Sequence, residues 1–185
     1  MSQDRTRKIV ITGVLGAISA FLGFTHWGFI PWLSGASLTI MHVPVVIGAI
    51  LEGPIVGAVI GLIFGLFSML QAAIAPSGPT DVWFTNPILA VLPRLFIGPV
   101  AWLVWMGLKR WPVPGLIVAG LAGSITNTVL VLGTIGLMGL LPWVALGPIV
   151  VANGIPEAIL CAILVLVIVS AWKQIEIGRK KGSKI

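Results

Sequence analysis

Apolar runs long enough to cross a lipid bilayer fill most of this sequence. A transmembrane helix needs about 20 predominantly apolar residues, and we expect six spans, at residues 8–28, 37–51, 54–74, 87–108, 114–140 and 145–172. Only 9% of the 185 residues are charged and the mean hydropathy is +1.12, whereas soluble domains carry about 25% charged residues. The sequence therefore predicts an all-α integral membrane protein with a single six-helix domain over residues 1–185.

Glycine and proline mark the breaks between these spans, as helix ends usually require. The breaks are PWLSGAS (31–37), EGP (52–54), APSGPTDVWFTNP (75–87), KRWPVPG (109–115) and GLLPW (139–143). Pro44 lies inside the short second span, where we expect a tilt or a kink. Glu52 lies in a turn, where we expect a solvated carboxylate that caps the following helix.

The positive charges indicate how the chain is oriented. Ten of the eleven Lys and Arg residues precede the first span, separate spans four and five, or follow the sixth: Arg5, Arg7, Lys8, Lys109, Arg110, Lys173, Arg179, Lys180, Lys181 and Lys184. By the positive-inside rule, both termini are predicted to be cytoplasmic. The cations are not interleaved with aromatic residues along a face, so the net charge of +6 does not indicate a nucleic-acid partner.

Five polar side chains lie inside the spans and are not explained by contact with lipid: His42, Arg94, Asn127, Asn153 and Glu157. A charge in the hydrocarbon costs about 2.5 to 3.5 kcal/mol on insertion scales, so such residues usually face a cavity or one another. Counted along their helices, all five fall in the outer half of the bundle. We expect either an internal Arg94–Glu157 ion pair without a ligand, or a pocket that opens outward and holds an anionic group on Arg94.

Small residues spaced four apart form two further patterns, which allow another helix to approach closely. Span three carries Gly53, Gly57, Gly61 and Gly65, and span one carries Gly13 with Ala17 and Gly16 with Ala20. Packing within the bundle and contact with another protein are both open for span three. For span one, whose pattern begins at the cytoplasmic end, a partner protein is the favoured interpretation.

The sequence lacks common motifs of enzyme active sites. It contains no phosphate-binding loop, no HExxH and no GxSxG motif. The single cysteine, Cys161, excludes an intramolecular disulfide and offers no thiolate cluster for a metal. We therefore expect no enzymatic activity, no cofactor and no metal site.

Four stretches, in order, carry a resemblance to a known family. They are LTIMHVPVVIGAILEGPIVGAVIGLIFGL (38–66), PRLFIGPVAWLVWMGLKR (93–110), GLAGSITNTVLVLG (120–133) and NGIPEAILCAILV (153–165). With the basic N-terminus, the sequence resembles the substrate-binding S components of energy-coupling-factor (ECF) transporters, which take up vitamins in prokaryotes. The MHVP and SITNT stretches look most like S components assigned to pantothenate or to unassigned vitamins, while folate, riboflavin, lipoate and hydroxymethylpyrimidine remain open.

The resemblance implies a multi-pass plasma-membrane protein that binds a vitamin from outside and works with a transmembrane coupling protein and two cytoplasmic ATPases. It implies a pocket in the outer half, under the loops between spans one and two and between spans three and four. The substrate-binding candidates are His42, Trp32, Trp83, Asn86, Arg94, Asn127, Asn153 and Glu157. The resemblance also implies that Gly13, Gly16, Ala17 and Ala20 meet the coupling protein. A self-sufficient channel or small permease, and a membrane scaffold, are the alternative functions.

Overall fold

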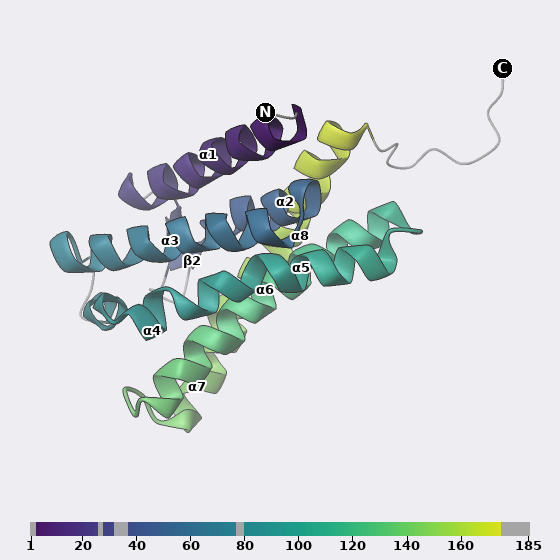
Figure 1. Cartoon of the computed structure of the whole chain (residues 1–185). Coiled ribbons are helices and arrows are strands. Elements are labelled where there is room, and N and C mark those ends of the chain that lie inside the picture. The colour runs from purple at the N-terminus through teal and green to yellow at the C-terminus, as the bar shows by residue number, and fades with distance from the viewer. Residues whose placement is uncertain (1–2, 26–27, 32–36, 77–79, 175–185) are drawn as a thin grey trace, which may run out of the picture.

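Helices form nearly all of the structure, a computed structural model that describes residues 3–25, 28–31, 37–76 and 80–174. The elements are α1 (Gln3–Phe24), β1 (Phe29–Pro31), β2 (Ser37–Thr39), α2 (Val43–Glu52), α3 (Pro54–Ile74), the 3-10 helix η1 (Asp81–Thr85), α4 (Pro87–Ala90), α5 (Leu92–Leu108), α6 (Pro112–Leu137), α7 (Trp143–Ile149), the π-helix η2 (Val150–Gly154) and α8 (Ile155–Lys173). Five helical stretches are long and apolar enough to span a bilayer: α1, α3, α4 with α5, α6, and α7 through α8. The shorter apolar helix α2 lies among them (Figure 1).

The second predicted span, residues 37–51, is a helix only in its second part. Its first residues form β2, which pairs in antiparallel fashion with β1 so that Phe29 lies opposite Thr39. This short hairpin was not predicted. Pro44 is in the first turn of α2, where the lack of a peptide N–H costs nothing, so it begins the helix and does not kink it.

Helix α2 is the centre of the bundle, because it contacts α1, α3, α5, α6 and α8. Every residue from Met41 to Ile50 is buried, and a helix that is apolar on all sides requires such an environment. With ten residues and a rise of 1.5 Å each, α2 is about 15 Å long, half the thickness of the hydrocarbon core. Helix α2 is therefore too short to cross the bilayer by itself.

Gly57, Gly61 and Gly65 of the span-three ladder pack inside the molecule, whereas a Cβ on Gly53, at the turn between α2 and α3, would meet nothing within 4 Å. A Cβ on Gly57 would lie 2.9 Å from the Cα of Gly98, and one on Gly65 would lie 2.8 Å from the Ala90 carbonyl oxygen. At Gly61 a Cβ would collide with the carbonyl oxygen of Arg94. These glycines let α3 approach the backbones of α4 and α5, so the ladder positions Arg94 and is not left open for another chain.

Helix α1 lies at the edge of the bundle, packed on α2 and α3 (Figure 1). Gly16 is buried against Ile63 of α3, and the Ser19 hydroxyl donates a hydrogen bond to the Met41 carbonyl at 2.9 Å. Gly13 and Ala17 lie on the exposed side of the helix. The two small-residue pairs of span one thus face in different directions.

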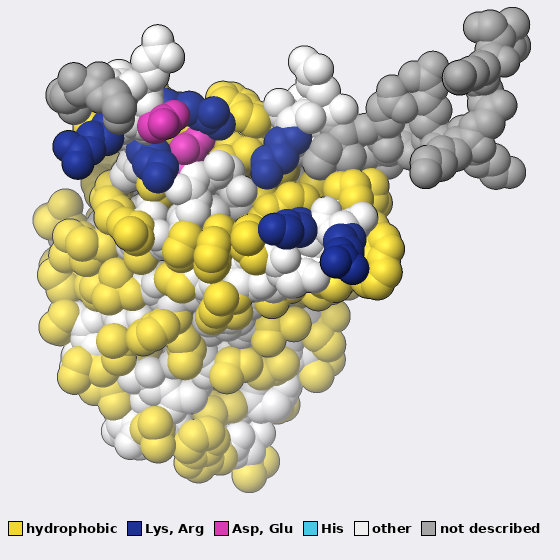
Figure 2. All heavy atoms as spheres, turned by 45° about the vertical axis from the view of Figure 1, so that its right-hand side comes forward, with side chains coloured by type: hydrophobic (Ala, Val, Ile, Leu, Met, Phe, Trp, Pro, Cys, Tyr) yellow, Lys and Arg dark blue, Asp and Glu magenta, His cyan; other side chains and the backbone are white. Residues whose placement is uncertain are grey.

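The surface agrees with a membrane-embedded body. In Figure 2, Lys and Arg side chains gather toward one end, and apolar side chains are spread over much of the rest of that face. At the basic end, Arg7 Nε lies 2.8 Å from Glu52 Oε1. The Glu52 side chain is only 6% exposed, so the expectation of a solvated carboxylate was wrong.

Candidate functional site

Arg94 owes its position to the proline that precedes it. Pro93 has no peptide N–H, so the Leu89 carbonyl, four residues earlier, has no helical partner. The chain breaks there into α4 and α5, and Arg94 Nη1 donates a hydrogen bond to the Leu89 oxygen at 2.6 Å. The carbonyl that Pro93 leaves without a helical partner thus holds the Arg94 guanidinium in place.

Two aromatic rings enclose this guanidinium. The Arg94 Cζ lies 5.2 Å from the ring centre of Phe64 on α3 and 5.0 Å from that of Phe84 on η1. Such distances permit cation–π attraction, which is stronger where water is excluded. Arg94 is 5% exposed, so it lies inside the bundle and does not face the acyl chains.

His42, Arg94 and Asn127 lie at one level of the bundle on neighbouring elements. Helices α2, α5 and α6 meet at Gly123, where a Cβ would lie 2.5 Å from Val46 and 3.6 Å from Ile97. Residues three or four apart share a helix face. One turn further from the basic end, the same faces carry His42, Arg94 and Asn127, and all three are buried.

Within the residues that the structure describes, several polar atoms of this layer are buried without a hydrogen-bond partner. They are both ring nitrogens of His42, Nε of Arg94, Oδ1 of Asn127 and Oγ of Ser124. By contrast, the Thr126 hydroxyl donates to the Ala122 carbonyl at 2.7 Å within its own helix. Roughly 90% or more of buried polar groups in proteins are satisfied. Five unsatisfied atoms from four residues in one layer therefore indicate a place for a polar ligand.

Glu157 connects α8 to the hairpin. Its Oε1 accepts a hydrogen bond from the Thr39 peptide N–H at 2.6 Å. Within the described residues, Arg94 and Glu157 form no ion pair, so the first of the two alternatives, a direct link between spans four and six, is not observed. The carboxylate instead holds the end of β2 over the buried layer.

The remaining substrate-binding candidates are placed more peripherally. Asn153 lies in the π-turn η2, and π-turns are frequent at functional sites. Asn86 caps α4, since its Oδ1 accepts a hydrogen bond from the Ile88 N–H at 2.9 Å. Trp83 on η1 is half-buried against an apolar cluster of α4, α6 and α7. Trp32 lies outside the described residues.

Sequence reasoning missed three residues of this layer: Phe64, Phe84 and Ser124. The two rings lie 20 positions apart in the sequence, and each lies close to the Arg94 guanidinium. Ser124 had a usable signal, because it lies three residues before Asn127 and so on the same helix face. In the part of the chain that the structure describes, no group of three or more His, Cys, Asp or Glu side chains could hold a metal ion.

Comparison with known proteins identifies the family to which the chain belongs. The pattern of the family described as ECF transporter, substrate-specific component, matches residues 7–169. The chain belongs to this family. It is therefore a substrate-binding subunit for vitamin uptake, a multi-pass protein of the prokaryotic plasma membrane and a component of a transporter.

Two curated relatives are named for the transport of the same vitamin. The chain is 32% identical over 191 aligned positions to the pantothenic acid transporter PanT of Lactococcus lactis subsp. cremoris (strain MG1363), covering 92% of this chain and 96% of that protein. It is 35% identical over 115 positions to the pantothenate transporter PanT of Leuconostoc mesenteroides, covering 60% of this chain and 55% of that protein. The family supports neither an independent channel nor a scaffold.

Proposed function

We propose that this S component binds pantothenate in the layer formed by His42, Arg94, Ser124 and Asn127. The observation that carries the proposal is a group of polar atoms around the buried Arg94 that, among the described residues, have no hydrogen-bond partner. Both curated relatives are named for pantothenate transport, which supports this vitamin among those that the family takes up.

The chemistry of pantothenate suits this layer. The molecule carries one carboxylate, one amide and two hydroxyls, so it needs one cation and several neutral hydrogen-bonding groups. Arg94 is the group that would hold the carboxylate through charge-assisted hydrogen bonds. His42, Ser124 and Asn127 are neutral groups that would hold the hydroxyls and the amide.

The loop elements would close the layer over the ligand. Phe84 on η1 stacks on Arg94, and Glu157 holds Thr39 at the end of β2, so one loop is tied to the layer and the other to α8. Asn153, Trp83, Trp32 and Asn86 are proposed to complete the contacts from η2 and from the loops.

Transport would require the partners that characterise ECF systems. We infer that the loaded chain docks on a transmembrane coupling protein and topples within the membrane, and that two ATPase subunits supply the energy to reset it. Gly13 and Ala17 are exposed on α1 and Ala20 is half-buried, whereas Gly16 is buried against Ile63. The proposed contact with the coupling protein therefore rests on Gly13 and Ala17.

Calorimetric titration of the purified chain with pantothenate, riboflavin and folate tests the ligand. We expect heat of binding for pantothenate alone, and a loss of affinity of roughly 10- to 150-fold in Arg94→Gln, the loss expected for a hydrogen bond to a charged group. The control Arg110→Gln removes an exposed charge at the other end and should bind normally. Binding of another vitamin in place of pantothenate would overturn the substrate, and full affinity in Arg94→Gln would overturn the site.

Reconstitution in liposomes separates a binding subunit from a permease. The chain alone should bind pantothenate without accumulating it, and accumulation should require the coupling protein, the ATPases and ATP. Flux through liposomes that contain only this chain would contradict the proposed division of labour.

A further inference from the structure

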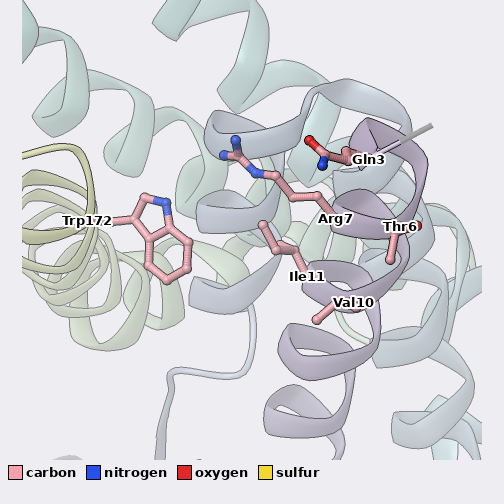
Figure 3. Close-up of a pocket in the computed structure, with 6 residues that line it drawn as sticks. All are labelled: Gln3, Thr6, Arg7, Val10, Ile11 and Trp172. Carbon is pink, nitrogen blue, oxygen red and sulfur yellow. The ribbon is translucent and has the colours of Figure 1, made fainter.

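A groove at the basic end plays no part in the proposed pantothenate site. It has a volume of about 550 Å³ and lies between the start of α1 and the end of α8. It is lined by Gln3, Thr6, Arg7, Val10, Ile11 and Trp172 (Figure 3). None of these side chains belongs to the buried polar layer.

The lining of the groove changes from polar to apolar along α1. Gln3, Thr6 and Arg7 lie on the first turns of α1 and offer an amide, a hydroxyl and a guanidinium. Val10 and Ile11 follow one turn further along the helix, and Trp172 lies across from them. At 1.5 Å per residue, the polar and apolar parts together extend about 12 Å along the helix. A molecule with an anionic head and an apolar tail would match this order.

Arg7 is held in place and still faces the groove. Its Nε makes the ion pair with Glu52, and Figure 3 shows its guanidinium extending from α1 toward Trp172. Arg7 is 58% exposed, whereas Glu52 is almost completely enclosed. The buried carboxylate therefore fixes the arginine, while the outer edge of the guanidinium stays accessible. Arg5 and Lys8, on the same exposed turns, add positive charge nearby.

We propose that this groove binds an anionic phospholipid from the leaflet that surrounds the basic end. The phosphate lies against Arg7, Thr6 and Gln3, and an acyl chain lies along Val10, Ile11 and Trp172. Charge favours an anionic lipid, because each Lys or Arg near such a surface contributes about 1 kcal/mol. The apolar part of the groove favours a lipid over a soluble phosphate. The indole of Trp172 is also a side chain that is enriched at membrane interfaces.

Native mass spectrometry of the full chain, titrated with phosphatidylglycerol or phosphatidylcholine of the same acyl chains, tests the proposal. We expect preferential binding of phosphatidylglycerol, which falls about fivefold in Arg7→Gln, the equivalent of about 1 kcal/mol for one cation. Arg110→Gln removes the same charge outside the groove and should keep the preference. Glu52→Gln also breaks the ion pair but leaves the positive charge of Arg7, so it should lower the preference less than Arg7→Gln does.

The variants distinguish binding from fold maintenance. If Glu52→Gln lost phosphatidylglycerol as completely as Arg7→Gln does, the ion pair alone would matter and the proposal would fail. Equal losses in Arg7→Gln and Arg110→Gln would indicate a diffuse surface charge and would overturn it too. Glycerol phosphate should not displace the lipid; if it did, the groove would be a soluble-anion site. Equal binding of both lipids would overturn the proposal and would favour a protein partner as the occupant of the groove.

Discussion

Asn127 and its neighbour Thr126 occupy the same turn of α6 but differ in how their polar atoms are satisfied. The Thr126 hydroxyl donates to its own helix, whereas Asn127 Oδ1 is buried without a partner. An unsatisfied buried polar atom costs about 1 to 3 kcal/mol. Because the two residues differ in this way, substitutions at these positions can separate effects on stability from effects on ligand binding.

Asn127→Leu should stabilise the ligand-free chain while weakening the binding of pantothenate. Removing the unsatisfied amide should raise the free energy of unfolding by about 1 kcal/mol or more, and the lost ligand contact should lower affinity roughly tenfold. Thermal melting in detergent and calorimetric titration measure the two effects. Thr126→Val is the matched control and should leave affinity unchanged. A less stable ligand-free Asn127→Leu variant would mean that the amide has a structural partner.

At the scale of elements, the contact of α3 with α5 determines where Arg94 lies. Gly61→Ala would drive a methyl group against the Arg94 carbonyl oxygen. We expect a loss of stability of about 1 to 3 kcal/mol, as for other overpacked sites, together with weaker pantothenate binding. Gly133→Ala on α6 is the control, since a Cβ there meets nothing within 4 Å. Melting and titration that gave the same result for both variants would contradict this role of Gly61.

The break between α4 and α5 offers a second test at this scale. Pro93→Ala would return a peptide N–H to the Leu89 carbonyl, which would then compete with Arg94 Nη1. We expect a more continuous helix and a loss of affinity of roughly 2- to 12-fold, the net worth of one hydrogen bond. Pro99→Ala, in the same helix, should leave affinity unchanged. Titration of both variants with pantothenate makes the comparison, and equal affinities would mean that Pro93 does not position the guanidinium.

Hydropathy predicted the long elements well, because a helix of about 20 apolar residues has few alternatives in lipid. The third span was predicted at 54–74, where α3 is found. The hairpin and the π-turn left no such signal, since their existence depends on contacts such as that of Glu157 with Thr39. Arg94 and Asn127 stood out as polar residues in apolar runs, but Phe84 joins them only through tertiary packing.

At the scale of the whole molecule, the bundle separates the proposed pantothenate site from the proposed contact with the coupling protein. The unsatisfied polar atoms lie inside, around α2, whereas α1 packs on α2 and α3 and turns its other face outward. That outer face carries Gly13 and Ala17 together with exposed apolar side chains such as Val14 and Phe21. A change on this face can therefore affect docking without reaching the ligand.

Ala17→Leu should leave pantothenate binding intact and reduce ATP-dependent uptake. A leucine at a close helix contact costs about 1 to 3 kcal/mol through overpacking, which lowers the docking constant roughly 5- to 150-fold. Uptake into liposomes that contain the coupling protein and both ATPases measures docking, and titration of the isolated chain measures binding. Ala73→Leu places the same side chain on an exposed position of α3 and should support normal uptake. If both variants lost uptake equally, α1 would have no special part in the assembly; if Ala17→Leu lost binding, the two interactions would not be separate.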